Sequence, residues 1–406
     1  MNELTLLSPS VRADPYPYYA NLRREAPVQR LDPFGLWAIS RYDEVLHVVK
    51  HPEIFSSSAM RTLAMGGISM AAGSGQMLEA AELAQSDTLI AADPPRHTRL
   101  RNLVNRAFTP RRIAALEPRM REIAAEALDP CIERGDLELV RDLSTPLPVR
   151  VIAELLGVPA SRFRDFKRWS DALVTSISTT SADVDVSQLM EARRELVAFL
   201  VEQVAEAQRS PRDNLLGALV RAQADEGVLT EAEAVSFGLL LLVAGNETTT
   251  NLIGNALLAL LEHPDQLGRV QSDPSLIPNL IEEALRYDSP VQGLLRRTSR
   301  DVETAGTKIP EGEPIMILFA SANRDERQFA EPDRFDITRD TRGHLAFGFG
   351  IHFCLGASLA RLEARVALEA ILSRCRDLHR LDSGPVRWID SLLLRGPREL
   401  HLGFTS

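Results

Sequence analysis

The sequence predicts a mainly α-helical fold with small β-sheets, and three observations support this fold class. Apolar residues recur at helical spacing along most of the 406 residues. Residues 230–261 form one long helical segment whose centre is apolar nearly all round, as expected of a helix that crosses the core. Strand-like runs are few and short, at residues 37–40 and 314–319. Because no repeat or linker divides the sequence, we expect a single domain over residues 1–406.

The predicted helices carry start and stop signals. Thr109 and Pro110 are typical of the cap and first position of a helix, and Thr230 with Glu233 fits a capping box at the start of the long one. Gly157 is typical of the position just past a helix end. The helices expected besides the long one cover residues 111–133, 149–156, 189–208, 276–287 and 357–374.

Composition and charge narrow the function classes. The formal net charge of -10, from 46 Lys and Arg against 56 Asp and Glu, disfavours nucleic acid as a partner. The N-terminal residues do not have the basic start and apolar core of a signal peptide, and no run reaches the roughly 20 apolar residues of a membrane span. We therefore expect a cytoplasmic protein without a membrane anchor.

One segment, residues 60–76, is rich in Gly, Ala, Ser and Met and nearly uncharged. A loop of this length is often a lid over a binding site, and a variable surface loop explains the same composition equally well. Both interpretations stay open.

Three cysteines, Cys131, Cys354 and Cys375, are widely spaced, and no CxxC motif occurs. The odd count and the spacing disfavour a disulfide framework and a zinc cluster. We expect that any functional cysteine acts alone.

Cys354 ends the glycine- and aromatic-rich segment FGFGIHFCLG, which covers residues 347–356 and precedes a predicted helix. Glycines allow the backbone to turn tightly and to approach a flat cofactor. A helix N-terminus favours a thiolate over a thiol. A lone buried cysteine is ordinarily a small apolar side chain. The loop and the helix start favour a thiolate ligand here.

This segment resembles the heme-binding signature of the cytochrome P450 family, with Phe347, Gly350, His352, Cys354 and Gly356 at the signature positions. Further motifs match in the family's order, so the resemblance extends over essentially the whole chain. It implies a single heme domain with heme b (iron protoporphyrin IX). Cys354 would ligate the iron, and a proximal thiolate favours O–O cleavage. The loop residues implied to contact the heme are Phe347, Gly348, His352, Cys354 and Gly356.

The long helix contains Ala244, Gly245, Glu247 and Thr248 at its centre. A glycine in mid-helix costs about 1 kcal/mol, and an acid in an apolar helix costs more. The two small residues would leave room for the heme. The resemblance assigns the family's proton-relay pair to Glu247 and Thr248. The alternative is an ion-paired Glu and a Thr that only bends the helix by bonding the carbonyl four residues back.

Two further sets of residues follow from the resemblance. The heme propionates are assigned to four cationic side chains: His97, Arg101, Arg296 and His352. Arg297 is an alternative to Arg296. Glu283 and Arg286, three apart on a predicted helix, would pair and support the cysteine loop. A later arginine, Arg334, or a neighbouring backbone segment would complete this network.

Substrate contacts are expected from mainly apolar segments, which predicts a lipophilic substrate such as a terpenoid, steroid, fatty acid or macrolide. The alternative is that half of these residues belong to the core. The candidates are Leu240, Val243 and Ala244, then Val291, Gln292, Leu294 and Leu295, then Leu392, Leu393 and Leu394, with residues 60–89 above them.

The heme domain uses the whole chain, so the resemblance implies that electrons arrive from a separate ferredoxin or flavodoxin and an NAD(P)H-dependent reductase. Arg361 and Arg365, with Arg106, Arg111 and Arg112, could form a basic patch for such a partner. The expected reaction inserts one oxygen atom of O2 into a C–H bond or adds it to a double bond. The alternatives are a peroxide-driven peroxygenase, a non-catalytic heme sensor and a helical binding protein without heme.

Overall fold

The computed structural model describes residues 5–6, 8–31, 35–61, 88–178, 186–211, 214–226 and 229–405. These residues form two compact units. The first unit comprises Met1–Ser56, Glu117–Leu147 and Thr248–Ser406, and the second comprises Ser57–Leu116 and Pro148–Glu247. The described part is mostly helical with small sheets, which confirms the predicted fold class. None of its helices combines the length and the apolar character needed to cross a bilayer.

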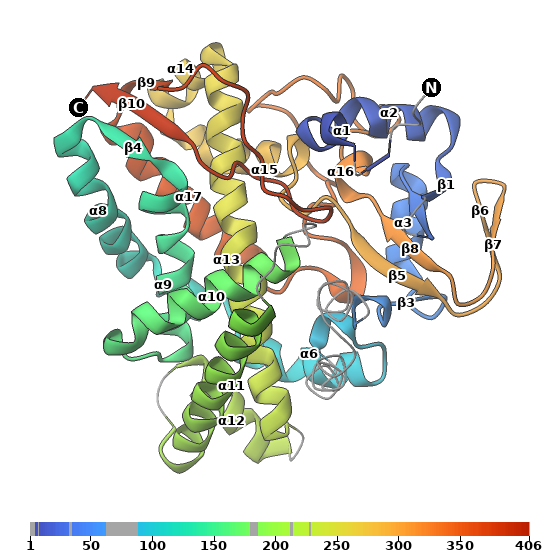
Figure 1. Ribbon diagram of the computed structural model, residues 1–406, viewed down its shortest axis with the longest axis horizontal. Coiled ribbons are helices and arrows are strands. Elements are labelled where there is room, and N and C mark those ends of the chain that lie inside the picture. Colours follow the sequence, from blue (N-terminus) through green and yellow to red (C-terminus); the bar gives the residue numbers. More distant parts are fainter. Residues whose placement is uncertain are drawn as a thin grey trace. The chain divides into compact units, whose positions relative to one another are not determined.

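The main sheet lies in the first unit and joins strands from both ends of the chain. Its strand order is β1 (Val28–Leu31), β2 (Leu36–Ile39), β8 (Pro314–Ile317), β5 (Leu294–Thr298) and β3 (Phe55–Ser56). Figure 1 shows the blue N-terminal strands beside the orange strands β5 and β8. Only the β2–β8 pair among these strands is parallel. Ile39, Phe55 and Ile317 pack in one buried cluster with helix α3 (Tyr42–Lys50) and helix α16 (Phe319–Ala322).

Two smaller sheets were not predicted from the sequence. One joins β4 (Asp136–Glu138), β10 (His401–Thr405) and β9 (Arg376–Arg380), and the other is the hairpin β6 (Val302–Thr304) with β7 (Thr307–Ile309). These strands span three to five residues, so too few side chains alternate to mark them in the sequence.

The helices of the first unit support the cysteine loop. Helix α17 packs against α8 and α15. The predicted helices at 276–287 and 357–374 are confirmed as α15 and α17. The bounds are α1 (Pro9–Ala13), α2 (Tyr16–Glu25), α8 (Glu117–Arg134), α14 (Pro264–Ser272), α15 (Ile277–Tyr287) and α17 (Ala357–Arg374).

The prediction of one helix over residues 111–133 was wrong, because the chain forms α7 (Pro110–Ala114) and then α8. Thr109 does cap α7, since its side chain accepts the Arg112 N–H at 3.3 Å. Pro118 is the second residue of α8, in the first turn, where a helix tolerates a proline because the N–H groups there have no partner within the helix. The break between α7 and α8 lies just before this proline, whereas Pro130 lies inside α8.

The second unit is a set of packed helices. Helix α10 packs on α11, and α12 packs on both α11 and α6. The predicted helix at 189–208 is confirmed within α11. The bounds are α6 (Arg96–Ala107), α10 (Phe163–Ser178), α11 (Val186–Arg209) and α12 (Leu215–Glu226), and α9 (Pro146–Leu156) lies almost entirely in this unit.

The long predicted helix is α13 (Glu231–Glu262), and its capping box is confirmed. The Glu233 N–H donates to the Thr230 hydroxyl at 3.2 Å, and the Thr230 N–H donates to the Glu233 carboxylate at 2.9 Å. The helix also carries buried polar side chains. In the first unit, Thr250 donates to the Ser144 carbonyl at 2.8 Å, and Asn255 donates to the Asp288 and Arg395 carbonyls at 2.9 and 3.0 Å. Polar contacts as well as apolar packing therefore fix this part of the helix.

Two asparagines one turn apart on α13 test this conclusion. Asn255→Leu should lower the free energy of unfolding by about 2 kcal/mol or more, because two buried carbonyls lose their donor. Asn251 is equally buried, and its side-chain amide makes no hydrogen bond within the described residues. Asn251→Leu is the matched control and should be nearly neutral. If the two substitutions lowered the free energy of unfolding in urea equally, the stabilising role of the Asn255 hydrogen bonds would be contradicted.

Candidate functional site

The cysteine loop leads directly into α17. Gly348 and Gly350 adopt φ of +68° and +71°, a left-handed conformation that favours glycine. A Cβ atom at Gly350 would also lie 3.0 Å from the Val49 carbonyl oxygen. The Cys354 N–H donates to the Phe347 carbonyl at 2.9 Å and closes the loop. The loop therefore presents one sulfur, three residues before a helix N-terminus.

The thiol of Cys354 differs from the other two cysteines in its exposure. None of the three cysteines forms a disulfide within the described residues, but Cys131 and Cys375 are buried and Cys354 is half-buried. Burial raises the pKa of the Cys375 thiol to about 11, and burial also raises the pKa of Cys131. These two thiols are kept neutral, which leaves Cys354 as the candidate ligand.

Glu283 and Arg286 on α15 form a fully buried ion pair. The Arg286 Nε and Nη2 atoms donate to the two Glu283 carboxylate oxygens, both at 2.8 Å. The sequence suggested either the Arg334 side chain or a neighbouring backbone segment as a further partner of this pair. The backbone is the partner, since the Arg334 carbonyl accepts from Arg286 at 3.2 Å. The extra guanidinium comes from Arg339, whose Nε lies 3.3 Å from the Glu283 carboxylate. No sequence pattern marks Arg339, because it lies far along the chain in an irregular segment.

Asn323 connects this ion pair to the cysteine loop. Its carbonyl accepts from Arg286 Nη1 at 3.1 Å, and its side-chain oxygen accepts the Leu345 N–H at 2.6 Å. Leu345 lies two residues before Phe347, where the loop begins. A continuous chain of hydrogen bonds therefore runs from α15 to the loop.

The cationic candidates occupy distinct positions in the two units. In the second unit, His97 is buried and Arg101 is half-buried, four residues apart on the same face of α6. Neighbouring Arg96 and Arg99 instead pair with Glu233.

In the first unit, Arg296 is buried in β5 and donates to the Leu295 carbonyl at 2.7 Å. The alternative, Arg297, is on the other face of the strand and donates to the Gly312 carbonyl at 2.6 Å. Burial therefore favours Arg296 over Arg297 as the candidate.

The central part of α13 in the second unit has one incompletely buried face. Leu240, Val243, Ala244 and Glu247 follow helical spacing and are half-buried or exposed, whereas intervening Asn246 is buried. An apolar face left partly open on a long core helix is typical of a ligand-binding side.

Gly245 also contributes to helix packing. A Cβ atom there would lie 2.9 Å from Ile152 Cδ1 on α9, so close packing of two helices requires this glycine. The space it leaves is therefore filled by a protein side chain. Ala244, which is exposed, is the small residue on the open face.

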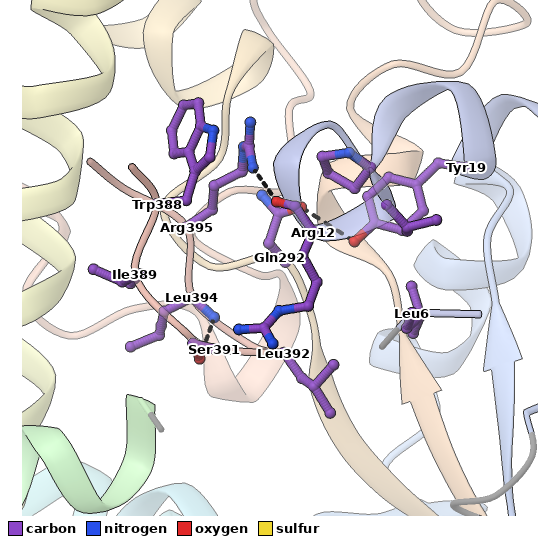
Figure 2. A pocket seen from close by; sticks show the side chains of 12 residues that line it. Leu6, Arg12, Tyr19, Gln292, Trp388, Ile389, Ser391, Leu392, Leu394 and Arg395 are labelled. Atoms are coloured by element: carbon purple, nitrogen blue, oxygen red, sulfur yellow. Dashed lines mark hydrogen bonds between the residues drawn. The ribbon is translucent and has the colours of Figure 1, made fainter. Parts of the chain in front are cut away.

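The substrate candidates at 291–295 and 392–394 lie together in the first unit. Val291 forms a β-bridge with Leu394, and the Gln292 N–H donates to the Leu393 carbonyl at 2.7 Å. Figure 2 shows that Leu392 and Leu394 line a pocket with Gln292 and Arg12, whereas Leu393 is not among its lining residues and is buried. Leu294 is half-buried in β5. The proposed lid falls mainly on residues 62–87, which lie outside the described residues.

Glu363 is a buried acid that the sequence prediction missed. It lies on α17, is 1% exposed, and shares a side-chain hydrogen bond with Thr249 of α13. Burial raises the pKa of Glu363 to about 8, and the hydrogen bond with Thr249 opposes that rise only in part. Leu359 and Ala367, one turn away on either side, are buried too. An acidic residue between apolar residues at helical spacing was the sequence signal that could have identified Glu363.

The donor set fits a heme. The first unit offers one half-buried cysteine sulfur in a loop of glycines and aromatic side chains, together with the buried Arg296. A Cβ atom at Gly356 would lie 3.9 Å from the Cys354 sulfur, so the backbone there is close to the sulfur. A single thiolate with a nearby glycine backbone suits an iron that a flat ring already holds. Buried and half-buried cations suit the ring's carboxylates.

Glu363→Gln should change how stability depends on pH. An unfolded Glu ionises near its ordinary pKa of 4.5, whereas the folded carboxyl stays protonated up to about 8. The contribution of Glu363 to stability is therefore present below pH 4.5 and is lost as pH rises toward 8, by about 1.4 kcal/mol per pH unit. The free energy of unfolding, measured in urea, should fall less between pH 5 and pH 8 in the variant than in the wild-type protein. Glu369→Gln, on the partly exposed side of α17, is the control, and identical pH profiles for all three proteins would contradict the prediction.

The comparisons with known proteins identify the family. The family model described as "Cytochrome P450" matches residues 149–400. "Cytochrome P450 107B1" of Saccharopolyspora erythraea is 42% identical over an alignment of 399 positions, which covers 94% of this chain and 93% of the relative. "Vitamin D(3) 25-hydroxylase" of Pseudonocardia autotrophica is 43% identical over 374 residues, which are 91% of this chain and 88% of that protein.

A solved structure extends the similarity to the fold. CYP109E1 from Bacillus megaterium, in complex with corticosterone, superposes with a TM-score of 0.86 at 37% identity, over 98% of this chain and 100% of that chain. These relatives span nearly the full length of the described chain and of their own chains. The protein belongs to the cytochrome P450 family and is a heme-dependent monooxygenase of bacterial type.

Proposed function

We propose that this enzyme inserts one oxygen atom of O2 into a lipophilic substrate by hydroxylation or epoxidation. The single observation that carries the proposal is the half-buried Cys354 sulfur, presented by a glycine loop just before α17. Bound heme b with a thiolate ligand supplies the oxygen-activating chemistry, because the thiolate donates electron density to the iron.

The residue roles in this proposal divide between ligand, cofactor contacts and proton delivery. Cys354 ligates the iron. Phe347, Gly348 and Gly356 contact the heme from the loop, with Ala244 and Gly245 assigned to the helix side. The propionates are assigned to four side chains: His97, Arg101, Arg296 and His352. The pair Glu283–Arg286 supports the loop.

Glu247 and Thr248 are proposed to deliver protons to the oxygen-binding side. Glu247 belongs to the incompletely buried face of α13, so its carboxyl can exchange protons with water while Thr248 follows it directly in the helix. A positioned acid and hydroxyl of this kind typically contribute a factor of about 100 or more to a proton-dependent step. This pair favours an oxygen-activating enzyme over a peroxygenase or a heme sensor, neither of which needs delivered protons.

The substrate is proposed to be a lipophilic molecule of steroid size. The proposed substrate contacts are Leu240 and Val243 on the incompletely buried face of α13. Val291, Leu294 and Leu393 are the proposed contacts from the segments 291–295 and 392–394. One relative is named for hydroxylating vitamin D(3), and one similar structure holds corticosterone. Both names support an apolar, multi-ring substrate for this chain.

Electrons are proposed to come from NAD(P)H through a reductase and a ferredoxin or flavodoxin. The expected contribution of Arg361 and Arg365 to a basic docking patch is weakened, because each is ion-paired with a glutamate. Arg106, Arg111 and Arg112 remain the cationic candidates. The single domain over residues 1–406 and the cytoplasmic location stay predictions, testable by limited proteolysis and cell fractionation.

The ligand assignment is tested by spectroscopy of the reduced protein under carbon monoxide. The wild-type protein should show the red-shifted Soret band of a thiolate-ligated heme, and Cys354→Ala should abolish that band. Cys131→Ala is the matched control and should keep it. A retained band in Cys354→Ala would place the ligand elsewhere, and a colourless wild-type protein would overturn the whole proposal.

The proton-delivery assignment is tested by the coupling of electrons to product. Thr248→Ala should keep the heme spectrum but lower product formed per electron by about tenfold, with the balance released as peroxide. Thr250→Ala removes a hydroxyl two positions along the same helix, where it bonds the Ser144 carbonyl. It should lower stability and leave coupling unchanged. Unchanged coupling in Thr248→Ala would rule out the relay, and peroxide-driven turnover at the oxygen-driven rate would favour the peroxygenase.

A further inference from the structure

A second cluster of charged side chains lies beside the buried Glu283–Arg286 pair. Glu282, on a different face of α15, accepts two hydrogen bonds from Arg361 of α17, from Nε at 2.5 Å and from Nη2 at 2.8 Å. The same carboxylate lies 3.0 Å from Nε2 of His344. A two-pronged contact between arginine and carboxylate fixes the plane of the guanidinium as well as its position.

The Glu282 carboxylate is partly buried and stays ionised. Burial alone would raise the pKa of Glu282, but the hydrogen bonds from Arg361 and His344 outweigh it and lower that pKa to about 2. His344 is 7% exposed at its side chain, and Arg361 is 36% exposed. The Glu282 carboxylate is therefore an anion at ordinary pH, and it restrains the Arg361 side chain.

Arg361 in turn covers the first residue of the cysteine loop. Its guanidinium carbon lies 4.5 Å from the centroid of the Phe347 ring, within the range of a cation–π contact. The Phe347 ring meets the Phe353 ring at a centroid distance of 6.3 Å, and the Phe347 carbonyl accepts the Cys354 N–H. One aromatic residue thus connects the guanidinium to both ends of the loop.

We propose that Arg361, held by Glu282, which His344 also contacts, is a positioning residue that fixes the Cys354 loop through the ring of Phe347. This inference rests on the proposed role of Cys354 as heme ligand. Arg361 acts on a different part of the loop from Glu283 and Arg286, which reach it through Asn323 and the backbone of Leu345. The cysteine loop therefore has two separate supports from α15.

This assignment replaces the role that the sequence suggested for Arg361. A cation reserved for an electron-transfer partner would face solvent with its charge available. Here the Nε and Nη2 groups on one edge of the Arg361 guanidinium are directed at Glu282, and its flat face is directed at Phe347. The helix offers a matched comparison in Arg365, one turn later, which pairs with Glu117 and Glu369 instead.

The test compares Arg361→Gln with Arg365→Gln in the heme-loaded protein. Substituting a group that orients a metal ligand typically costs a factor of 10–100 in affinity. Arg361→Gln should therefore lose heme to excess apomyoglobin about tenfold faster and convert a larger share of the reduced carbon monoxide complex from the thiolate to the neutral-thiol spectrum. Arg361→Lys keeps the charge but loses the planar two-pronged contact, so it should fall between wild type and Arg361→Gln. Arg365→Gln should match wild type in both readouts.

A second variant and a double substitution keep the inference falsifiable. If Arg361→Gln does not fold, Glu282→Gln releases the same guanidinium with a smaller change and should shift both readouts in the same direction. Combining Arg361→Gln with Phe347→Leu should give less than the product of the two separate effects, since both act through one ring.

The outcomes separate this inference from the proposed function. Equal heme loss and equal spectra in Arg361→Gln and Arg365→Gln, even with lower thermal stability in both, would show a merely structural ion pair and overturn the inference. Independent effects of the Arg361 and Phe347 substitutions would overturn it too. A wild-type protein without the thiolate band would instead refute the proposed function itself.

Discussion

A buried pair of opposite charges, Glu283 and Arg286, fixes the path of the backbone that leads to the cysteine loop. Removing two charges from water is costly unless further hydrogen bonds satisfy them. Here those bonds come mainly from main-chain groups between Asn323 and Asp336, so this irregular segment cannot move away without leaving a charge unsatisfied. The charge pair therefore supplies order to a stretch that has little regular secondary structure of its own.

Helix α13 combines two requirements that oppose each other. Its C-terminal part is held by buried polar contacts from Thr249, Thr250 and Asn255, which fix its position and rotation in the first unit. Its central face in the second unit, at Leu240 and Ala244, is left incompletely buried. A helix with an apolar face that is not fully packed loses some burial energy there. The polar contacts farther along compensate for that loss.

The sequence was sufficient for features whose signals are local. Helical periodicity and capping residues predicted α13, α15 and α17, and the glycine pattern identified the loop before Cys354. It was insufficient where contacts join distant parts of the chain. Arg339 lies more than fifty residues from Glu283, and the contact of Gly245 with Ile152 depends on helix packing that spacing does not reveal. The short strands at β4 and β6 had too few residues to show an alternating pattern.

The conformation of the cysteine loop explains why its supports lie outside it. Left-handed glycines and backbone hydrogen bonds, among them the one from Cys354 to Phe347, give the loop its shape, but glycine also allows many alternative conformations. A metal ligand must be held to within about half an ångström. Glycines cannot supply that restraint, so it has to come from neighbouring side chains. The hydrogen bond from the Leu345 N–H to Asn323 and the stacking of Arg361 on Phe347 act on the segment that enters the loop, before the flexible glycines. Helix α17 fixes the segment that leaves it.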